Sequence, residues 1–170
     1  MATSPSVPEL VATAQIAASA SMDHIAQILN AMDGQNGTDA QIEDLRAATV
    51  ALELIAIDTF SLFEARSQHH FKRGPFSRKL TALLTASRKN DLANRLHQYY
   101  LAINVLKHGK GASYRELANN PNAMFAVKPA DDIIADETTE PVGLIDVTVA
   151  GFFDGLATTI LDAYNFLEKP

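Results

Sequence analysis

The chain has 170 residues, and 47 % of them are hydrophobic, so it is long enough to bury a core of its own. It contains no cysteine, which excludes disulfides, thiolate metal ligands and cysteine nucleophiles. No stretch of about 18 apolar residues occurs, and the N-terminus lacks the basic start and apolar run of a signal peptide. We therefore expect one domain, residues 1–170, in the cytoplasm and with no membrane contact.

A formal net charge of −6 hides a strong separation of charge along the sequence. Eleven of the 14 Lys and Arg residues lie between Arg66 and Arg115, where Asp91 is the one acidic residue, so this segment carries +10. The other 120 residues hold three basic and 19 acidic side chains, which gives −16. We call residues 66–115 the basic belt. Such a belt is typical of a surface that faces an anion, an acidic partner, or acidic elements of its own chain.

The first half of the chain predicts two helices. Apolar residues at helical spacing indicate a helix over residues 8–32, and glycines within residues 33–37 end it. Thr38 or Asp39 can cap a second helix, whose apolar stripe continues to about His70. At about 1.5 Å per residue this helix spans on the order of 45 Å, a length typical of a helix that frames a bundle.

Three shorter helices are predicted within the belt. A Gly-Pro pair separates the second helix from a third at residues 76–87. A fourth helix over residues 91–108 is ended by glycines. Ser113 followed by Glu116 is a capping-box pattern, which predicts a short helix over residues 113–118.

The C-terminal part is predicted to contain one loop and one helix. Residues 119–146 form an irregular acidic loop that contains the acidic run 131–140, and extended residues are expected at 125–127 and 144–147. A last helix covers residues 147–167. The fold class is therefore all-α. We expect an up-and-down bundle of about five helices plus a short one, with the second and fourth helices packed together at its centre.

The fourth helix carries a second face opposite its core stripe, with His97, Leu101, Asn104 and His108 on it. A polar face that still holds a leucine is typical of contact with a partner, either another helix or a second subunit. We expect a two-fold homodimer built on this face and the long helix. Near the helix end, Asn104, Lys107 and His108 fall within one turn. They can serve acid–base chemistry or phosphate binding, or His108 and Lys107 can simply satisfy helix-end carbonyls.

Residues 104–109, Asn-Val-Leu-Lys-His-Gly, resemble half of the motif of the HEPN superfamily. Its members are helical bundles, often dimeric, and many are RNases of toxin or antiviral systems. Active members carry an Arg before the Asn-to-His-Gly half, but residues 101–103 of this chain provide none. The resemblance implies a HEPN-like protein that binds RNA or another polyanion without robust catalysis. If there is catalysis, it implies a metal-independent RNase with His108 and Asn104 as catalytic residues.

A second group of candidate residues surrounds the junction of the second and third helices, residues 66–79. Cations and two adjacent histidines flank two aromatics there, which indicates a phosphate or nucleic-acid surface. The alternative is a solvated face that pairs with Glu53, Asp58, Glu64 or the acidic loop. The ligand-binding residues predicted from both groups are Arg66, His69, His70, Lys72, Arg73, Arg78, Lys79, His97, Lys107 and Lys110.

No metal site and no cofactor are predicted. Adjacent histidines such as His69 and His70 leave a helix about 100° apart, and no two histidines are spaced to bind one metal on one helix. Three functions remain open. The first is a HEPN-like protein that binds RNA or another polyanion, the second is a small regulatory or structural bundle that docks an acidic protein, and the third is an RNase.

Overall fold

The structure is a computed structural model, and it describes residues 3–128 and 143–170. Within these residues the chain forms six α-helices and one 3₁₀ turn, and an isolated bridge between Val127 and Ile145 is the only extended pairing. The prediction of an all-α bundle is therefore confirmed. Half of the acidic loop, residues 129–142 with the run 131–140, lies outside the residues that the structure describes.

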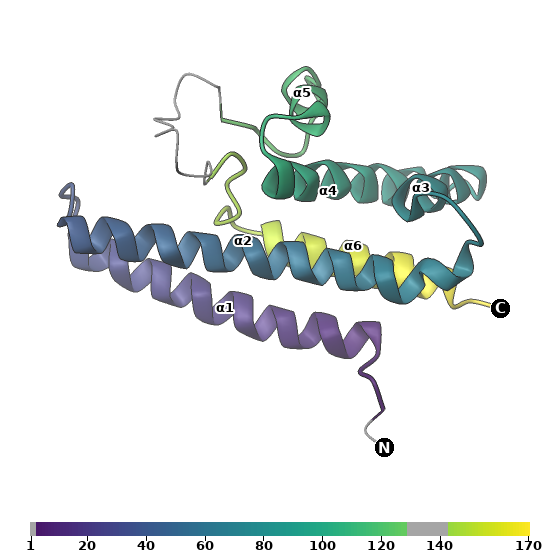
Figure 1. The fold of residues 1–170 in the computed structure, drawn as a ribbon, viewed down its shortest axis with the longest axis horizontal. Coiled ribbons are helices and arrows are strands. Elements are labelled where there is room, and N and C mark those ends of the chain that lie inside the picture. Colours follow the sequence, from purple (N-terminus) through teal and green to yellow (C-terminus); the bar gives the residue numbers. More distant parts are fainter. Residues whose placement is uncertain (1–2, 129–142) are drawn as a thin grey trace.

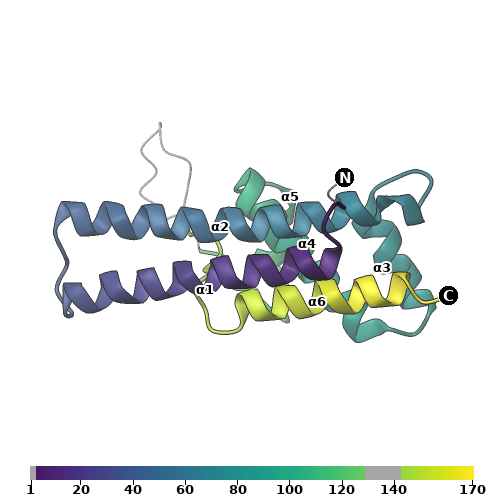
Figure 2. The same ribbon diagram turned by 90° about the horizontal axis from the view of Figure 1, so that it is seen from below.

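Helices α1 (Val7–Met32) and α2 (Asp39–Ser67) form a long antiparallel hairpin, which is the most extensive helix pair of the molecule. In Figures 1 and 2 this hairpin follows the long axis, and its turn lies beyond the ends of α4 and α6. We call residues 23–50 the hairpin tip. Its buried apolar side chains are Ile25, Ile28 and Ala48, so this part has a thin core.

Both hairpin helices begin with a capping box, in which two side chains satisfy backbone groups that a helix start leaves unpaired. Thr38 accepts a hydrogen bond from the Gln41 N–H, and the Gln41 side chain accepts one from the Thr38 N–H. Ser6 and Glu9 are arranged in the same way at the start of α1. Of the two predicted capping residues, Thr38 and Asp39, the structure shows Thr38 in this role.

The long helix is shorter than predicted, because α2 ends at Ser67 and a 3₁₀ turn, η1 (Gln68–His70), follows it. Helix α3 (Phe76–Ala86) and helix α4 (Asn90–His108) then pack against each other. Helix α4 also contacts α2 as expected, although α2 packs more extensively on α1 and α4 on α3.

The short helix α5 (Ala112–Ala118) begins differently from the prediction. Gly111 occupies the cap position, and no side chain caps the helix. Ser113 is therefore not a capping residue. The Glu116 carboxylate, which the capping box would use, instead accepts a hydrogen bond from the ring of His97 on α4. This contact holds α5 against α4.

Helix α6 (Phe152–Leu167) packs on α1, α2 and α4 and closes the core. It begins five residues later than predicted because Gly151, in the left-handed region at φ 85°, separates it from the turn before it. Side chains from α2, α3, α4 and α6 are completely buried here, among them Phe60, Leu80, Leu96 and Ile160. The thick part of the core thus lies away from the hairpin tip.

Helices α4 and α6 approach each other closely where Tyr99 meets Gly155. A side-chain carbon at Gly155 would collide with the Tyr99 hydroxyl, so only glycine leaves the room that this crossing needs. The hydroxyl donates a hydrogen bond of 2.8 Å to the Phe152 carbonyl oxygen. Burial raises the pKa of Tyr99 to about 12, so the phenol remains protonated as a donor.

Among the described residues, no helix combines the length and the apolar character that crossing a membrane requires.

Candidate functional site

The predicted pair of His108 and Asn104 lies at the end of α4. His108 is exposed and Asn104 is half-buried, and within the described residues no hydrogen bond joins the two side chains. Lys107 is exposed beside them and acts electrostatically on Glu64 of α2. The structure therefore places Lys107 where its charge acts on an acidic residue of α2. A catalytic role of His108 stays a prediction.

The second face of α4 is covered within one chain. Leu101 is buried, with 3 % of its surface exposed, and α5 packs on α4 with Leu117 buried as well. His97 on the same face forms an ion pair of 2.7 Å with Glu116 of α5. Of the two partners that this mixed face allows, another helix or a second subunit, the structure shows helices of the same chain, so the burial of Leu101 gives no support for a second subunit. A homodimer stays a prediction.

The cations of the basic belt remain at the surface. Arg95 is half-buried, donates to Thr159 at 3.2 Å and forms an ion pair of 2.9 Å with Asp162 of α6. Lys110 aside, no other Lys or Arg of the belt forms an ion pair within the described residues. The exposed belt cations are Arg66, Lys72, Arg73, Arg78, Lys79, Arg88, Lys89, Lys107, Lys110 and Arg115.

Many of these cations gather at one end of the bundle. Figures 1 and 2 show the C-terminal end of α2, helix α3 and the C-terminal end of α6 at the end opposite the hairpin turn. We call residues 66–79, 86–95 and 162–169 the cationic end. They hold nine Lys and Arg residues and three acidic residues. The separation of charge along the sequence is therefore also a separation of charge between the two ends of the molecule.

The cationic end contains a pocket of about 460 Å³, where the turn between α3 and α4 meets the end of α6. Its lining includes four cations and two carboxylates. An excess of positive charge in a concave, polar site favours small anionic groups such as a phosphate. Sequence reasoning did not find this pocket, because Lys169 lies far along the chain from the other three cations. The charged lining residues are Arg88, Lys89, Arg95, Lys169, Asp91 and Asp162.

The acidic residues expected to pair with the 66–79 cluster behave differently from one another. Glu64 accepts a hydrogen bond of 2.9 Å from the Ser77 hydroxyl, and burial raises its pKa against the opposing effects of Ser77 and Lys107. Burial also raises the pKa of Glu53, which accepts from the Gly143 N–H at 2.9 Å. Asp58 is exposed and forms no ion pair within the described parts of the chain. These acids leave the cations of the cluster largely unneutralised.

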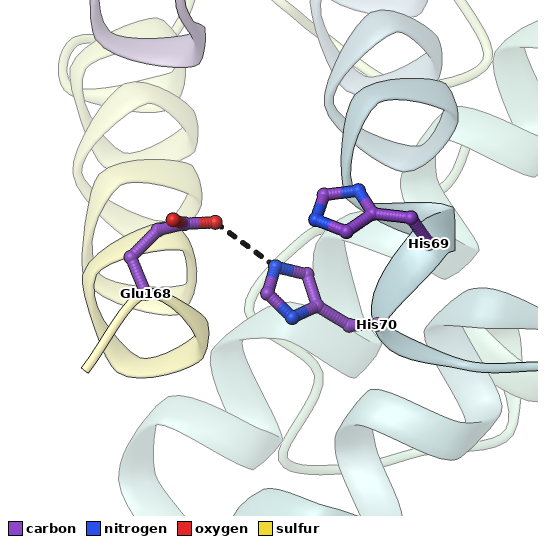
Figure 3. Close-up of side chains that lie close together, drawn as sticks. All are labelled: His69, His70 and Glu168. Carbon is purple, nitrogen blue, oxygen red and sulfur yellow. Dashed lines mark hydrogen bonds and ion pairs between the residues drawn. The ribbon is translucent and has the colours of Figure 1, made fainter. Parts of the chain in front are cut away.

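The two adjacent histidines meet an acidic residue that the sequence reasoning did not consider. Figure 3 shows His69 and His70 of η1 facing Glu168, which follows α6. The His70 Nε2 atom lies 2.9 Å from a Glu168 carboxylate oxygen, and the two imidazole centroids are 4.2 Å apart. The separation of about 100° expected from a regular helix does not apply here, because the two histidines lie in a 3₁₀ turn and their rings are close to each other.

No protein-family model, no curated protein and no solved structure matches this chain. The likeness to the HEPN superfamily therefore rests on the short motif alone. The function has to be argued from the chemistry of the residues described above.

Proposed function

We propose that the protein binds RNA through its basic belt, as a HEPN-like helical protein without robust catalysis. The observation that carries this proposal is the exposure of ten of the belt's eleven Lys and Arg side chains. Cations that served to pair with the protein's own acids would be found in ion pairs. Arg95 is in such a pair, while the cations around the junction of α2 and α3 form none with the acids in residues 3–128 and 143–170.

The separation of charge supports a polyanion as the ligand. A protein with a net charge of −6 repels RNA at long range unless its positive charges are grouped. Here the belt carries +10 and much of it lies at the cationic end, away from the acidic hairpin tip. Phosphate contacts by such side chains release counterions, so binding by the belt must weaken steeply as salt increases.

The sequence of α4 argues against strong catalysis. Cleavage of RNA develops negative charge on the phosphate, which a nearby cation must stabilise in the transition state. Residues 101–103, where the HEPN motif would place its Arg, are Leu, Ala and Ile, and all three are buried. A histidine at position 108 without that cation lacks the main source of stabilisation.

The proposal includes a homodimer in the cytoplasm, now supported by α2 rather than by α4. Leu54 and Leu62 lie on one side of α2 and are 51 % and 41 % exposed. Burying two such leucines in a two-fold interface gains free energy from the hydrophobic effect. Sedimentation that shows only monomer at high protein concentration would contradict this part.

The binding experiment uses a fluorescent single-stranded RNA whose anisotropy is measured at several salt concentrations. For the double variant Arg73→Glu with Lys79→Glu we expect an affinity loss of about tenfold or more, because two phosphate contacts become repulsive. We also expect the slope of log affinity against log salt to be shallower by about 1 to 2. The single variant Arg73→Glu is also measured, and Arg46→Glu is its matched control. Arg46 is exposed on α2 but lies in the hairpin tip.

Two results would contradict the proposal. If the double variant binds RNA as well as the wild type, or if the wild type has no salt-dependent affinity, the belt does not bind RNA, and an acidic protein becomes the better partner. If the wild type cleaves the RNA robustly and His108→Ala does not, the protein is an RNase.

A further inference from the structure

Three potential metal ligands converge at the cationic end from segments far apart in the sequence. His69 and His70 belong to η1, and Glu168 follows α6, 98 residues beyond His70. One donor atom from each of the three residues lies within 4.8 Å of the others. Figure 3 shows a ring nitrogen of each histidine directed toward the Glu168 carboxylate.

The hydrogen bonds fix which nitrogen of His69 is available. Its Nδ1 atom lies 2.9 Å from the Arg66 carbonyl oxygen. A carbonyl oxygen can only accept, so Nδ1 carries the proton, and in the neutral ring Nε2 keeps its lone pair. Histidines that bind metals nearly always donate their other ring N–H in this way, often to a backbone carbonyl. The end of α2 thus orients His69 as a ligand.

The distance between the ligand atoms of His70 and Glu168 is close to that between two ligands of one metal ion. With bonds of about 2.1 Å to nitrogen and oxygen, a tetrahedral metal separates its ligand atoms by about 3.4 Å. The His70 Nε2 and the Glu168 oxygen are 2.9 Å apart, so a metal that replaces the shared proton moves them by about 0.5 Å, since ~3.4 Å is needed. His69 and Glu168 are exposed, so their side chains can rotate to complete the set.

We propose that His69, His70 and Glu168 bind one divalent transition-metal ion, with Zn²⁺ as the best match. Two imidazoles and a carboxylate suit zinc, which accepts nitrogen and oxygen ligands in a tetrahedral site. The fourth position then holds water or an outside ligand. Arg66, Lys72 and Lys169 are exposed cations within three residues of a ligand in the sequence, and positive charge near the site repels a metal ion, so we expect micromolar rather than tighter affinity. This inference is independent of the RNA proposal.

The chain offers an internal comparison for the site. His97 and Glu116 form a similar pair, at 2.7 Å, between α4 and α5. The ring next to His97 belongs to Tyr100, which is not a metal-binding histidine, and the two ring centroids are 6.3 Å apart. If one histidine and one glutamate were enough to hold the ion, the pair of His97 and Glu116 would bind it as well as the pair of His70 and Glu168. If three ligands are needed, only the site of His69, His70 and Glu168 binds the ion.

The test is a calorimetric titration of the full chain with ZnCl₂. We expect one Zn²⁺ per chain, and an affinity at least about tenfold weaker in His69→Ala, His70→Ala and Glu168→Gln, because each removes a direct ligand. Glu116→Gln is the matched control, and we expect it to bind as the wild type does. In a separate measurement on the wild type, nuclear magnetic resonance should show the ring signals of His69 and His70 shifting with Zn²⁺, while those of His97 stay in place.

The same experiments can overturn the proposal. It fails if the wild type shows no saturable binding of Zn²⁺, or if Glu168→Gln leaves the affinity unchanged. It also fails if Glu116→Gln weakens binding as much as Glu168→Gln does. The resonance measurement needs no variant, so a misfolded substitution cannot mask a negative result.

Discussion

The hairpin tip and the cationic end lie at opposite ends of the long axis and differ in both charge and packing. The tip holds five acidic residues and one cation, Arg46, which is paired with Glu43. It consists of two helices with three buried apolar side chains. At the cationic end, nine cations accompany three acids, and α2, η1, α3, α4 and α6 meet. The comparison teaches that charged side chains gather where several segments converge. The tip also has a pocket, of about 590 Å³ at its turn, but no charged side chain lines it.

The largest expected effect tests the difference in packing. Leu80 of α3 is completely buried, so Leu80→Ala should lower the free energy of unfolding by about 3 to 4 kcal/mol. Ile25 of the hairpin tip is also buried, but its thin surroundings can relax around a cavity, so Ile25→Ala should cost about 2 kcal/mol. Urea denaturation of both variants measures these values. Equal losses would mean that the tip is packed as firmly as the core around Leu80, next to the cationic end.

A smaller effect tests how the tip is held at its turn. Thr38→Ala removes half of the capping box of α2 and should cost about 1 kcal/mol. We expect faster amide hydrogen exchange in the hairpin tip and unchanged exchange in α3 and α4. Thr85→Ala is the control, because Thr85 is exposed within α3 and bonds only to a carbonyl of its own helix. Its effect should stay within about 0.5 kcal/mol, and uniform changes in exchange would show that the tip does not unfold separately.

The smallest expected effect is a change in the pH dependence of stability, caused by Glu64. Burial raises the pKa of Glu64 in the folded protein, so its favourable contribution is complete below the ordinary value of 4.5 and is lost as pH rises through the folded pKa. Glu64→Gln cannot ionise, yet its amide oxygen can still accept from Ser77. The variant should therefore gain stability relative to wild type between acidic and neutral pH, by less than about 1 kcal/mol. Urea denaturation at both pH values measures the gain, and a relative loss would mean that Lys107 outweighs burial.

Much of the fold could be predicted from the sequence because its signals are local. Apolar spacing located the helices, and Thr38 marked the start of α2 correctly. Errors arose where a local pattern competes with a distant contact. Ser113 and Glu116 have capping-box spacing, but Glu116 binds His97 instead. Leu101 resembled an interface residue because its cover, α5, follows the glycine-rich segment 109–111, and no local rule places that helix.

The candidate sites were less predictable because they depend on contacts between distant segments. The charge count located the cations of the belt, and most of them are exposed as a binding surface requires. The pocket needs Lys169, and the histidine cluster needs Glu168, both from the end of α6. Nothing in the residues around His69 and His70 indicates which distant acid will face them. That information lies in how α6 packs across α4.

A side chain added at Gly155 would push α6 away from Tyr99 and so tilt the end of α6. Glu168 lies thirteen residues beyond Gly155, or about 20 Å along the helix axis, so a tilt of about 5° at Gly155 moves Glu168 by about 1.7 Å. Such a shift is larger than the adjustment needed for His70 and Glu168 to hold a metal. The position of the Glu168 carboxylate at the surface thus depends on the close packing that a half-buried glycine allows thirteen residues earlier.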